Sequence, residues 1–342
     1  MADFRRQYRR RSRTHPGLRG IRASNPSPGR PCPRNERCQT LRLQTPRKTR
    51  HTMKRLLEMR TPEFLALPRE QTVILFPVGV MEDHGPHHIP LGMDLIHAQA
   101  LTQELGLAIE ATQPGWKTVL MQGAPLAINA NTSHLALTQR AHVLRDFLVD
   151  TCLDLHRLGF RHFVAVTGTL GPRQLTAIED AGRVLRRRTG GLGLGRLLGA
   201  RWAKPGATLV CAQSALLSRA EALRAPLWTE PTDHGGQADT SVALHAASGL
   251  VAPEWKLLPP LEPTETGLGH AWALSQGRVS GYVGAPGKAT VEEGRQAIHA
   301  QVLELLPKLQ AVWEGELQPE RGFRSWYSVF PPNRSFFWGW VL

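Results

Sequence analysis

From residue 53 onwards, short apolar segments alternate with longer segments of helical periodicity, and this alternation is the feature that most constrains the fold. Four segments are short, apolar and partly β-branched, as buried strands are: Thr72–Val80, Lys117–Met121, Arg161–Thr167 and Ala207–Ala212. Helical patterns lie between and after them, at 95–108, 138–158, 174–188, 238–247 and 291–313. The alternation predicts an α/β domain with a largely parallel sheet and helices on both of its faces.

Two of these helices show a clear apolar stripe. In the segment 138–158 the stripe is formed by Leu144, Phe147, Leu148, Cys152 and Leu155, and Gly159 is placed where a helix C-terminus commonly has glycine. In the segment 291–313 the stripe is formed by Ile298, Val302, Leu305 and Leu309. Both helices are therefore expected to bury one face against the sheet.

The positive charge of the chain is confined to its first 52 residues. The formal net charge is +14; residues 1–52 hold 15 Lys and Arg against Asp3 and Glu36, whereas the rest holds 27 basic and 26 acidic residues. The first segment is rich in Arg, Pro and Ser and has no apolar period, so it is expected to be disordered. We predict a basic tail at 1–52, one α/β domain at 53–315 and an aromatic C-terminal tail at 316–342.

Three interpretations of the basic tail stay open. It is a nucleic-acid-binding arm, an Arg-rich targeting peptide, or an extension that is not native, since Met53 begins a plausible protein start just before the first strand. Association with nucleic acid is expected only if the tail is native.

Cysteine usage and hydropathy indicate a cytoplasmic protein without a membrane partner. Four cysteines are present, at positions 32, 38, 152 and 211, and they form neither a secreted-type disulfide framework nor a zinc ribbon. The sequence has no apolar run of 18 residues, which a membrane-spanning helix needs.

The chemistry-bearing residues follow the first strand. Glu82 and His84 leave it on a sharply turning loop, and Asp94 lies where the next helix begins. In open parallel sheets ligands bind outside the carboxyl ends of the strands. Mixed oxygen and nitrogen donors suit zinc or manganese, whereas calcium prefers oxygen alone. The alternative is a histidine-rich surface loop in which Asp94 only caps the helix.

The stretch PVGVMEDHGPHHIPLGMD (77–94) resembles the signature of the creatininase family of metal-dependent amidohydrolases. Three later stretches resemble further family motifs in the same order: LHRLGFRHFVAVTG (155–168), DHGGQADTS (233–241) and GYVGAPGKATVEEG (281–294). The resemblance implies a three-layer α/β/α domain, assembly into homo-oligomers, and two divalent metal ions.

By the same resemblance, Glu82 and His84 each hold one zinc or manganese ion and Asp94 bridges both. His234 matches a histidine that moves a proton. Asp239 stands where glutamate is usual and is expected to orient an imidazole by accepting its N–H. The implied activity is hydrolysis of a C–N bond in a small, cyclic or related amide substrate.

The second ligand loop departs from the family pattern. Where the family has an Asn-Gly-His sequence, this chain has Thr167, Gly168 and Thr169, and the following Leu170 and Gly171 carry no donor. Three outcomes stay open: a one-metal hydrolase, a catalytically inactive scaffold or partner-binding protein, or a two-metal site that recruits His87, His88, His134 or His142.

Overall fold

The computed structural model describes residues 53–85, 88–128, 135–190, 206–216, 233–261 and 282–315. Its centre is a five-stranded, fully parallel sheet in the order β1–β4–β2–β6–β7. The strands are β1 (Lys54–Arg55), β2 (Thr72–Val78), β4 (Lys117–Leu120), β6 (His162–Thr167) and β7 (Thr208–Cys211). The longest strand, β2, lies in the middle, where Ile74 pairs with Val119 on one side and Phe163 on the other.

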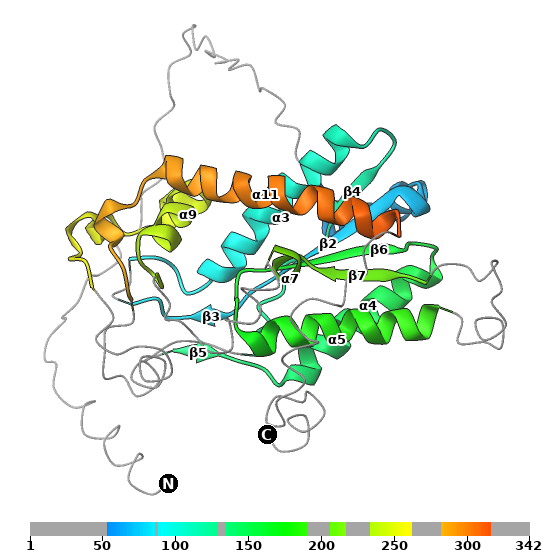
Figure 1. Cartoon of the computed structure of the whole chain (residues 1–342), viewed down its shortest axis with the longest axis horizontal. Coiled ribbons are helices and arrows are strands. Elements are labelled where there is room, and N and C mark those ends of the chain that lie inside the picture. The colour runs from blue at the N-terminus through cyan, green and yellow to red at the C-terminus, as the bar shows by residue number, and fades with distance from the viewer. Residues whose placement is uncertain are drawn as a thin grey trace, which may run out of the picture. The chain divides into compact units, whose positions relative to one another are not determined.

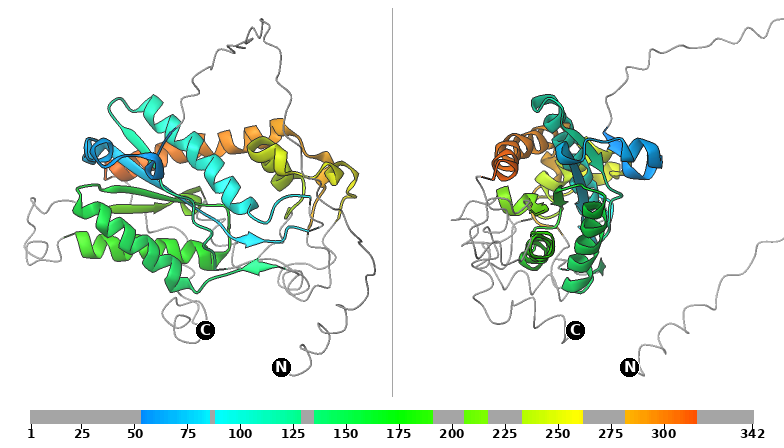
Figure 2. Two further views of the ribbon diagram at one scale, coloured as in Figure 1. Left: turned by 180° about the vertical axis from the view of Figure 1, so that it is seen from behind. Right: turned by 90° about the vertical axis from the view of Figure 1, so that its right-hand side faces the viewer.

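Helices cover both faces of this sheet, so the predicted three-layer α/β/α architecture is confirmed (Figure 1, Figure 2). One layer consists of α4 (Ala141–Arg157) and α5 (Pro172–Thr189). The other consists of α3 (Met93–Thr112), α9 (Gln237–Ala247) and α11 (Val291–Trp313). The connections hold the short helices η1 (Leu56–Glu58), α2 (Thr61–Leu65), η2 (Arg69–Gln71), α7 (Ala212–Leu216), η4 (Ser248–Leu250), η5 (Pro253–Leu257) and η6 (Pro286–Lys288).

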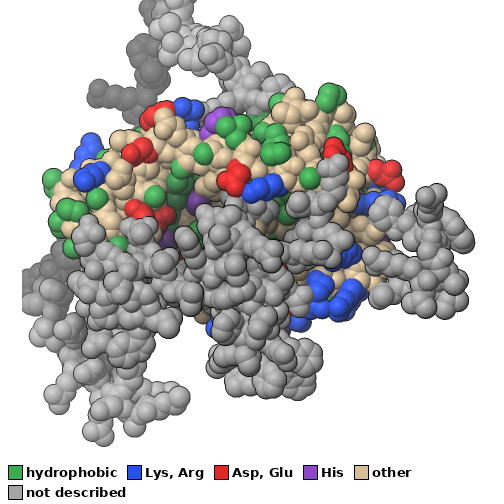
Figure 3. Space-filling model, in the orientation of Figure 1, with side chains coloured by type: hydrophobic (Ala, Val, Ile, Leu, Met, Phe, Trp, Pro, Cys, Tyr) green, Lys and Arg blue, Asp and Glu red, His purple; other side chains and the backbone are tan. Residues whose placement is uncertain are grey.

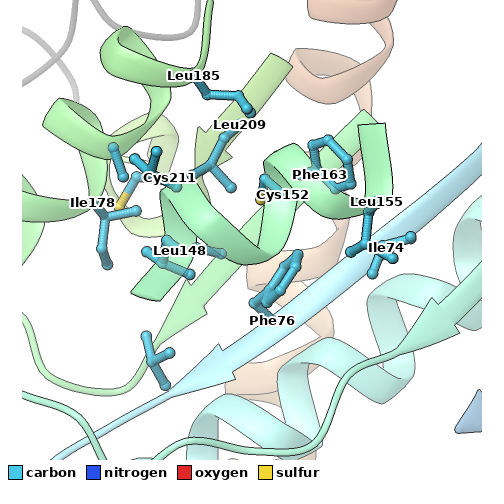
Figure 4. Packing of buried hydrophobic residues seen from close by; sticks show 14 of the residues in the cluster. Ile74, Phe76, Leu148, Cys152, Leu155, Phe163, Ile178, Leu185, Leu209 and Cys211 are labelled. Carbon is cyan, nitrogen blue, oxygen red and sulfur yellow. The ribbon is translucent and has the colours of Figure 1, made fainter. Parts of the chain in front are cut away.

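Successive side chains of β2 enter two different cores, because neighbours in a strand point to opposite faces of the sheet. Ile74 and Phe76 pack with the α4 and α5 layer, and Figure 4 shows them beside Leu148 and Phe163. Val73 and Leu75 pack with the α3 and α11 layer. A strand buried on both faces needs apolar residues at every position, which explains its continuous apolar run.

The helix and strand predictions hold except at their ends and in short elements. Helix α4 ends at Arg157, and Gly159 has a φ of +101°, as expected for the glycine after a helix. The predicted stripe of α4 is buried apart from Phe147, which is 37% exposed and lies at the margin of the stripe. The first strand ends at Val78, not Val80, because the chain leaves the sheet there to form β3 (Met81–Glu82).

Strands β1, β3 and β5 (Ala136–Leu137) were not predicted, since two-residue strands carry too little periodicity to detect. Among the described helices, none is both long and apolar enough to cross a bilayer. The predicted tails at 1–52 and 316–342 lie outside the described residues.

Candidate metal site

The candidate site lies where β2 and β6 end and where α3 begins. Two glycines allow the start of α3 to lie close to the ends of β2 and β6. A Cβ on Gly168 would lie 2.0 Å from the backbone oxygen of Asp94, and a Cβ on Gly79 would lie 2.5 Å from the backbone nitrogen of Leu95. Any larger residue would push the first turn of α3 away from the strand ends. Gly79 and Gly168 therefore keep Asp94 close to the loops that follow β2 and β6.

A small antiparallel ribbon fixes Glu82 and His84 next to Asp94. Strand β3 pairs with β5, and the Glu82 backbone nitrogen donates to the Leu91 carbonyl at 2.9 Å. The chain then turns sharply at Gly85, whose φ is +44°. His84 Nδ1 lies 3.3 Å from its own loop's Glu82 carbonyl, and its Nε2 lies 3.4 Å from Asp94 Oδ1.

The loop before α9 brings His234 onto the same spot. Its backbone forms a bridge with Val283, with hydrogen bonds of 3.1 and 2.8 Å. Gly235 follows with a φ of +63°, and a Cβ there would lie 2.2 Å from the His84 carbonyl oxygen. This contact stacks the rings of His84 and His234, with centroids 4.5 Å apart and planes at 19°.

Glu82, His84 and His234 form a buried group of metal-type donors. One ligand atom from each lies within 4.8 Å of the other two, and the residues are 4%, 3% and 7% exposed. Within the described residues, His234 Nε2 is buried without a hydrogen-bond partner. One carboxylate and two imidazoles are a donor set that zinc or manganese accepts, so the residues fit such an ion.

Figure 3 shows histidine side chains beside carboxylates on the viewed face. Asp94 lies beside this group, because its Oδ1 is 3.4 Å from His84 Nε2. It is not one of the three residues whose ligand atoms all lie within 4.8 Å of one another, which are Glu82, His84 and His234. The N-cap of α3 is Gly92, so the Asp94 carboxylate is directed to side chains of the site and not to the helix end.

Charge and burial set the protonation of His84, Asp94 and His234. Burial lowers the pKa of His84, but hydrogen bonding and charge from Asp94 outweigh it and raise this pKa to about 9. Burial raises the pKa of Asp94, yet its contacts with His84 and Thr169 bring it below its ordinary value. Burial and the neighbouring His84 charge lower the pKa of His234 to about 4, so its imidazole is neutral at neutral pH.

The other residues highlighted by the sequence take supporting positions. The Asp239 carboxylate accepts a hydrogen bond from the Gly235 nitrogen at 2.7 Å, which holds the turn after His234. His88 Nε2 lies 3.0 Å from Thr240 Oγ1, which joins the first loop to α9. His142 is on α4, whereas His87 and His134 lie outside the described residues.

Sequence reasoning assigned His234 to proton transfer only and did not place it among the metal-type donors. It also interpreted Thr169 as a missing ligand. In the structure, Thr169 Oγ1 donates to Asp94 Oδ2 at 2.5 Å. The available signal was the position of Thr169 just after a predicted strand, because ligands of parallel sheets bind outside the carboxyl ends of the strands.

Comparisons with known proteins point to one family. The chain matches the family model for creatininase, creatinine amidohydrolase, over residues 57–309. A search of curated proteins found no match.

Three solved structures illustrate the likeness in fold. A creatinine amidohydrolase (creatininase) has 18% identity and a TM-score of 0.52, covering 78% of this chain and 99% of its own. A putative creatinine amidohydrolase from Bacteroides fragilis has 19% identity and a TM-score of 0.57, covering 78% and 98%. A creatininase structure with Mn has 18% identity and a TM-score of 0.51, covering 78% and 100%. With the family model matched over most of its length, the chain belongs to the creatininase family.

Proposed function

We propose that this protein is a metal-dependent hydrolase that cleaves a C–N bond in a small, cyclic amide, with creatinine as the first substrate to test. The observation that carries the proposal is the buried convergence of Glu82, His84 and His234 at the carboxyl end of the sheet. The family model of creatinine amidohydrolase supports the same class of substrate.

In this proposal Glu82, His84 and Asp94 hold a zinc or manganese ion. A divalent cation supplies hydroxide from bound water near neutral pH and polarises an amide carbonyl. His84 Nε2 and Asp94 Oδ1 lie 3.4 Å apart, so both atoms can bind the same ion without a large movement.

His234 is proposed to move the proton. Its low pKa keeps the imidazole neutral, and its buried Nε2 has no partner within the described residues, so that atom can accept a proton and return it to the leaving nitrogen. The negative charge of Asp239 favours the protonated form of His234, which is the role proposed for this carboxylate.

A single ion is proposed in place of two. Within the described part of the chain, donors of this kind gather at one place only, around Glu82, His84 and His234, and Asp94 adjoins that place through His84. His88, one of the histidines proposed from the sequence to replace the missing ligand, has its Nε2 3.0 Å from Thr240 Oγ1.

Metal content per chain tests the proposal directly. The full-length protein, reconstituted with Zn²⁺ or Mn²⁺ and dialysed, is expected to retain one ion per chain by plasma mass spectrometry. Glu82→Gln and His84→Ala should lose it, whereas His299→Ala, which changes an exposed histidine of α11, should retain it. His234→Ala should keep the ion and lose creatinine hydrolysis. Absence of any bound ion in the reconstituted wild type would end the hydrolase proposal.

The second candidate is a catalytically inactive scaffold or partner-binding protein. The favouring observation is the loop after β6, where Leu170 and Gly171 offer no donor and the Thr169 hydroxyl is already bound to Asp94. It predicts a stable protein that holds no metal and whose melting temperature is unchanged in Glu82→Gln.

Further properties of the protein are proposed from the sequence. The protein is proposed to be a cytoplasmic homo-oligomer, with a domain at 53–315 between the two tails. Sedimentation velocity tests the oligomer, and cell fractionation tests the location. RNA binding that weakens with salt and disappears when residues 1–52 are removed would establish the tail as a nucleic-acid-binding arm.

A further inference from the structure

The Thr169 hydroxyl makes two hydrogen bonds with groups that build the site. Its Oγ1 donates to Asp94 Oδ2 at 2.5 Å and accepts from the Val80 backbone nitrogen at 3.0 Å. Thr169 is 7% exposed. A threonine hydroxyl has a single proton to donate. With the Val80 N–H pointing at the oxygen, that proton is committed to Asp94.

The backbone of Thr169 is itself fixed by a buried network. Its nitrogen donates to Thr167 Oγ1 at 3.1 Å, and the Thr167 hydroxyl donates back to its carbonyl at 3.0 Å. Gln213 Oε1 accepts from the Thr167 nitrogen at 2.8 Å. The hydroxyl of Thr169 therefore projects from a rigid turn, and its direction toward α3 is set before any ligand binds.

This bond determines which oxygen of Asp94 faces the donor group. The terminal torsion of an aspartate is broad and roughly two-fold, so a carboxylate without a fixed partner has no strongly preferred orientation. Here Thr169 takes Oδ2, and Oδ1 lies 3.4 Å from His84 Nε2. One oxygen alone is then presented to His84 and its neighbours.

We infer that Thr169 is a positioning residue: its hydroxyl orients the Asp94 carboxylate so that Oδ1 is held toward a cation at Glu82 and His84. The position that reads in the sequence as a lost ligand thus acts on the ion through Asp94. This inference rests on the proposed function, and it concerns how the site is built and not which substrate it takes.

Mn²⁺ affinity, measured on the full-length protein by the EPR signal of free Mn²⁺, tests the inference without any assay of activity. Thr169→Val and Thr169→Ala remove the hydroxyl and should weaken Mn²⁺ binding by about 10- to 100-fold, as loss of an outer-shell partner of a ligand does. Thr169→Ser keeps the hydroxyl and should stay within about three-fold of the wild type.

The matched control is Thr118→Val. Thr118 is also buried and its Oγ1 donates to Glu110 Oε1 at 2.8 Å, so the change also removes a hydroxyl–carboxylate bond. Glu110 lies on α3 about 24 Å along the helix from Asp94, since each residue rises about 1.5 Å. Its Mn²⁺ affinity should equal that of the wild type.

Each outcome decides a separate point. Weak binding in both hydroxyl-free variants, with Thr169→Ser and Thr118→Val near the wild type, supports the inference. Wild-type Mn²⁺ affinity in a hydroxyl-free Thr169 variant overturns the inference and leaves the proposed function standing. Equally weakened Mn²⁺ binding in Thr118→Val has the same consequence. A wild type that binds no Mn²⁺ overturns both. Far-UV circular dichroism identifies any variant that fails to fold, and the remaining hydroxyl-free variant then decides.

Discussion

Replacing Gly168 by alanine tests whether the approach of β6 to α3 holds the site together. The new Cβ would lie 2.0 Å from the Asp94 backbone oxygen, whereas ordinary contact begins at 3.4 Å. The two backbones must therefore separate by about 1.4 Å. Neither atom is at the end of a flexible side chain, so the cost should reach the upper part of the range for overpacking, about 3 kcal/mol.

A loss of this size should be visible in a thermal melt. For a domain of this length, 1 kcal/mol corresponds to about 2–4 °C, so Gly168→Ala should lower the melting temperature by about 6–12 °C. Because the displaced residue is Asp94, Mn²⁺ binding should also weaken by about ten-fold or more. Differential scanning calorimetry and the EPR titration measure the two effects on the same samples.

Two other glycines supply controls. Gly249→Ala places its Cβ where no heavy atom lies within 4 Å, and it should change neither property. Gly182→Ala places its Cβ 2.5 Å from the Leu209 carbonyl oxygen, between α5 and β7, so it should lower the melting temperature and leave Mn²⁺ affinity unchanged. A Gly168→Ala protein as stable as Gly249→Ala would refute the packing argument. A loss of stability with normal Mn²⁺ affinity would refute its link to the site.

Three further predictions concern residues away from the site. Burial is the main cause that lowers the pKa of His162 from 6.5 to about 4. Protonation of His162 therefore favours the unfolded chain. The stability that is present above pH 6.5 is lost as the pH falls toward 4. Chemical unfolding across this range should show a loss of about 1–3 kcal/mol that is reduced in His162→Phe. Burial also raises the thiol pKa of Cys152, and that of Cys211 to about 12, so Ellman's reagent should modify both only after unfolding; rapid native labelling would contradict this. Thr290 Oγ1 accepts from the Glu293 nitrogen at the start of α11, so Thr290→Ala should cost about 1 kcal/mol in urea unfolding and Thr290→Ser much less.

The layers of the fold were predictable because burial leaves a periodic record in the sequence. Strand β2 is buried on both faces and is apolar from Val73 to Val78, and the buried stripe of α11 repeats at helical spacing. The order of the strands was not predictable, since the pairing of Ile74 with both Val119 and Phe163 depends on contacts far apart in the chain. The ribbon of β3 and β5 is too short to leave a pattern.

For the site, the sequence identified residue types and their order but not their contacts. Glu82 and His84 are neighbours in the chain, so their proximity followed from local geometry. The stacking of His84 on His234 depends on the positive φ of Gly235, which a sequence does not state. The hydroxyl bond from Thr169 to Asp94 was missed for a similar reason: a comparison of ligand patterns registers the absence of an imidazole and gives no account of what the replacement side chain does.

The hydrogen bond between His88 and Thr240 joins parts of the chain that are 152 residues apart. Closing a loop of that length costs roughly 4 kcal/mol of chain entropy, more than any short-range contact in the domain has to overcome. During synthesis, the segments that carry Glu82 and Thr169 leave the ribosome long before α9 does. The order of translation therefore delays assembly of the donor group until His234 has emerged, and a product that ends before His234 would contain the strands of the described sheet and lack one of the three donors.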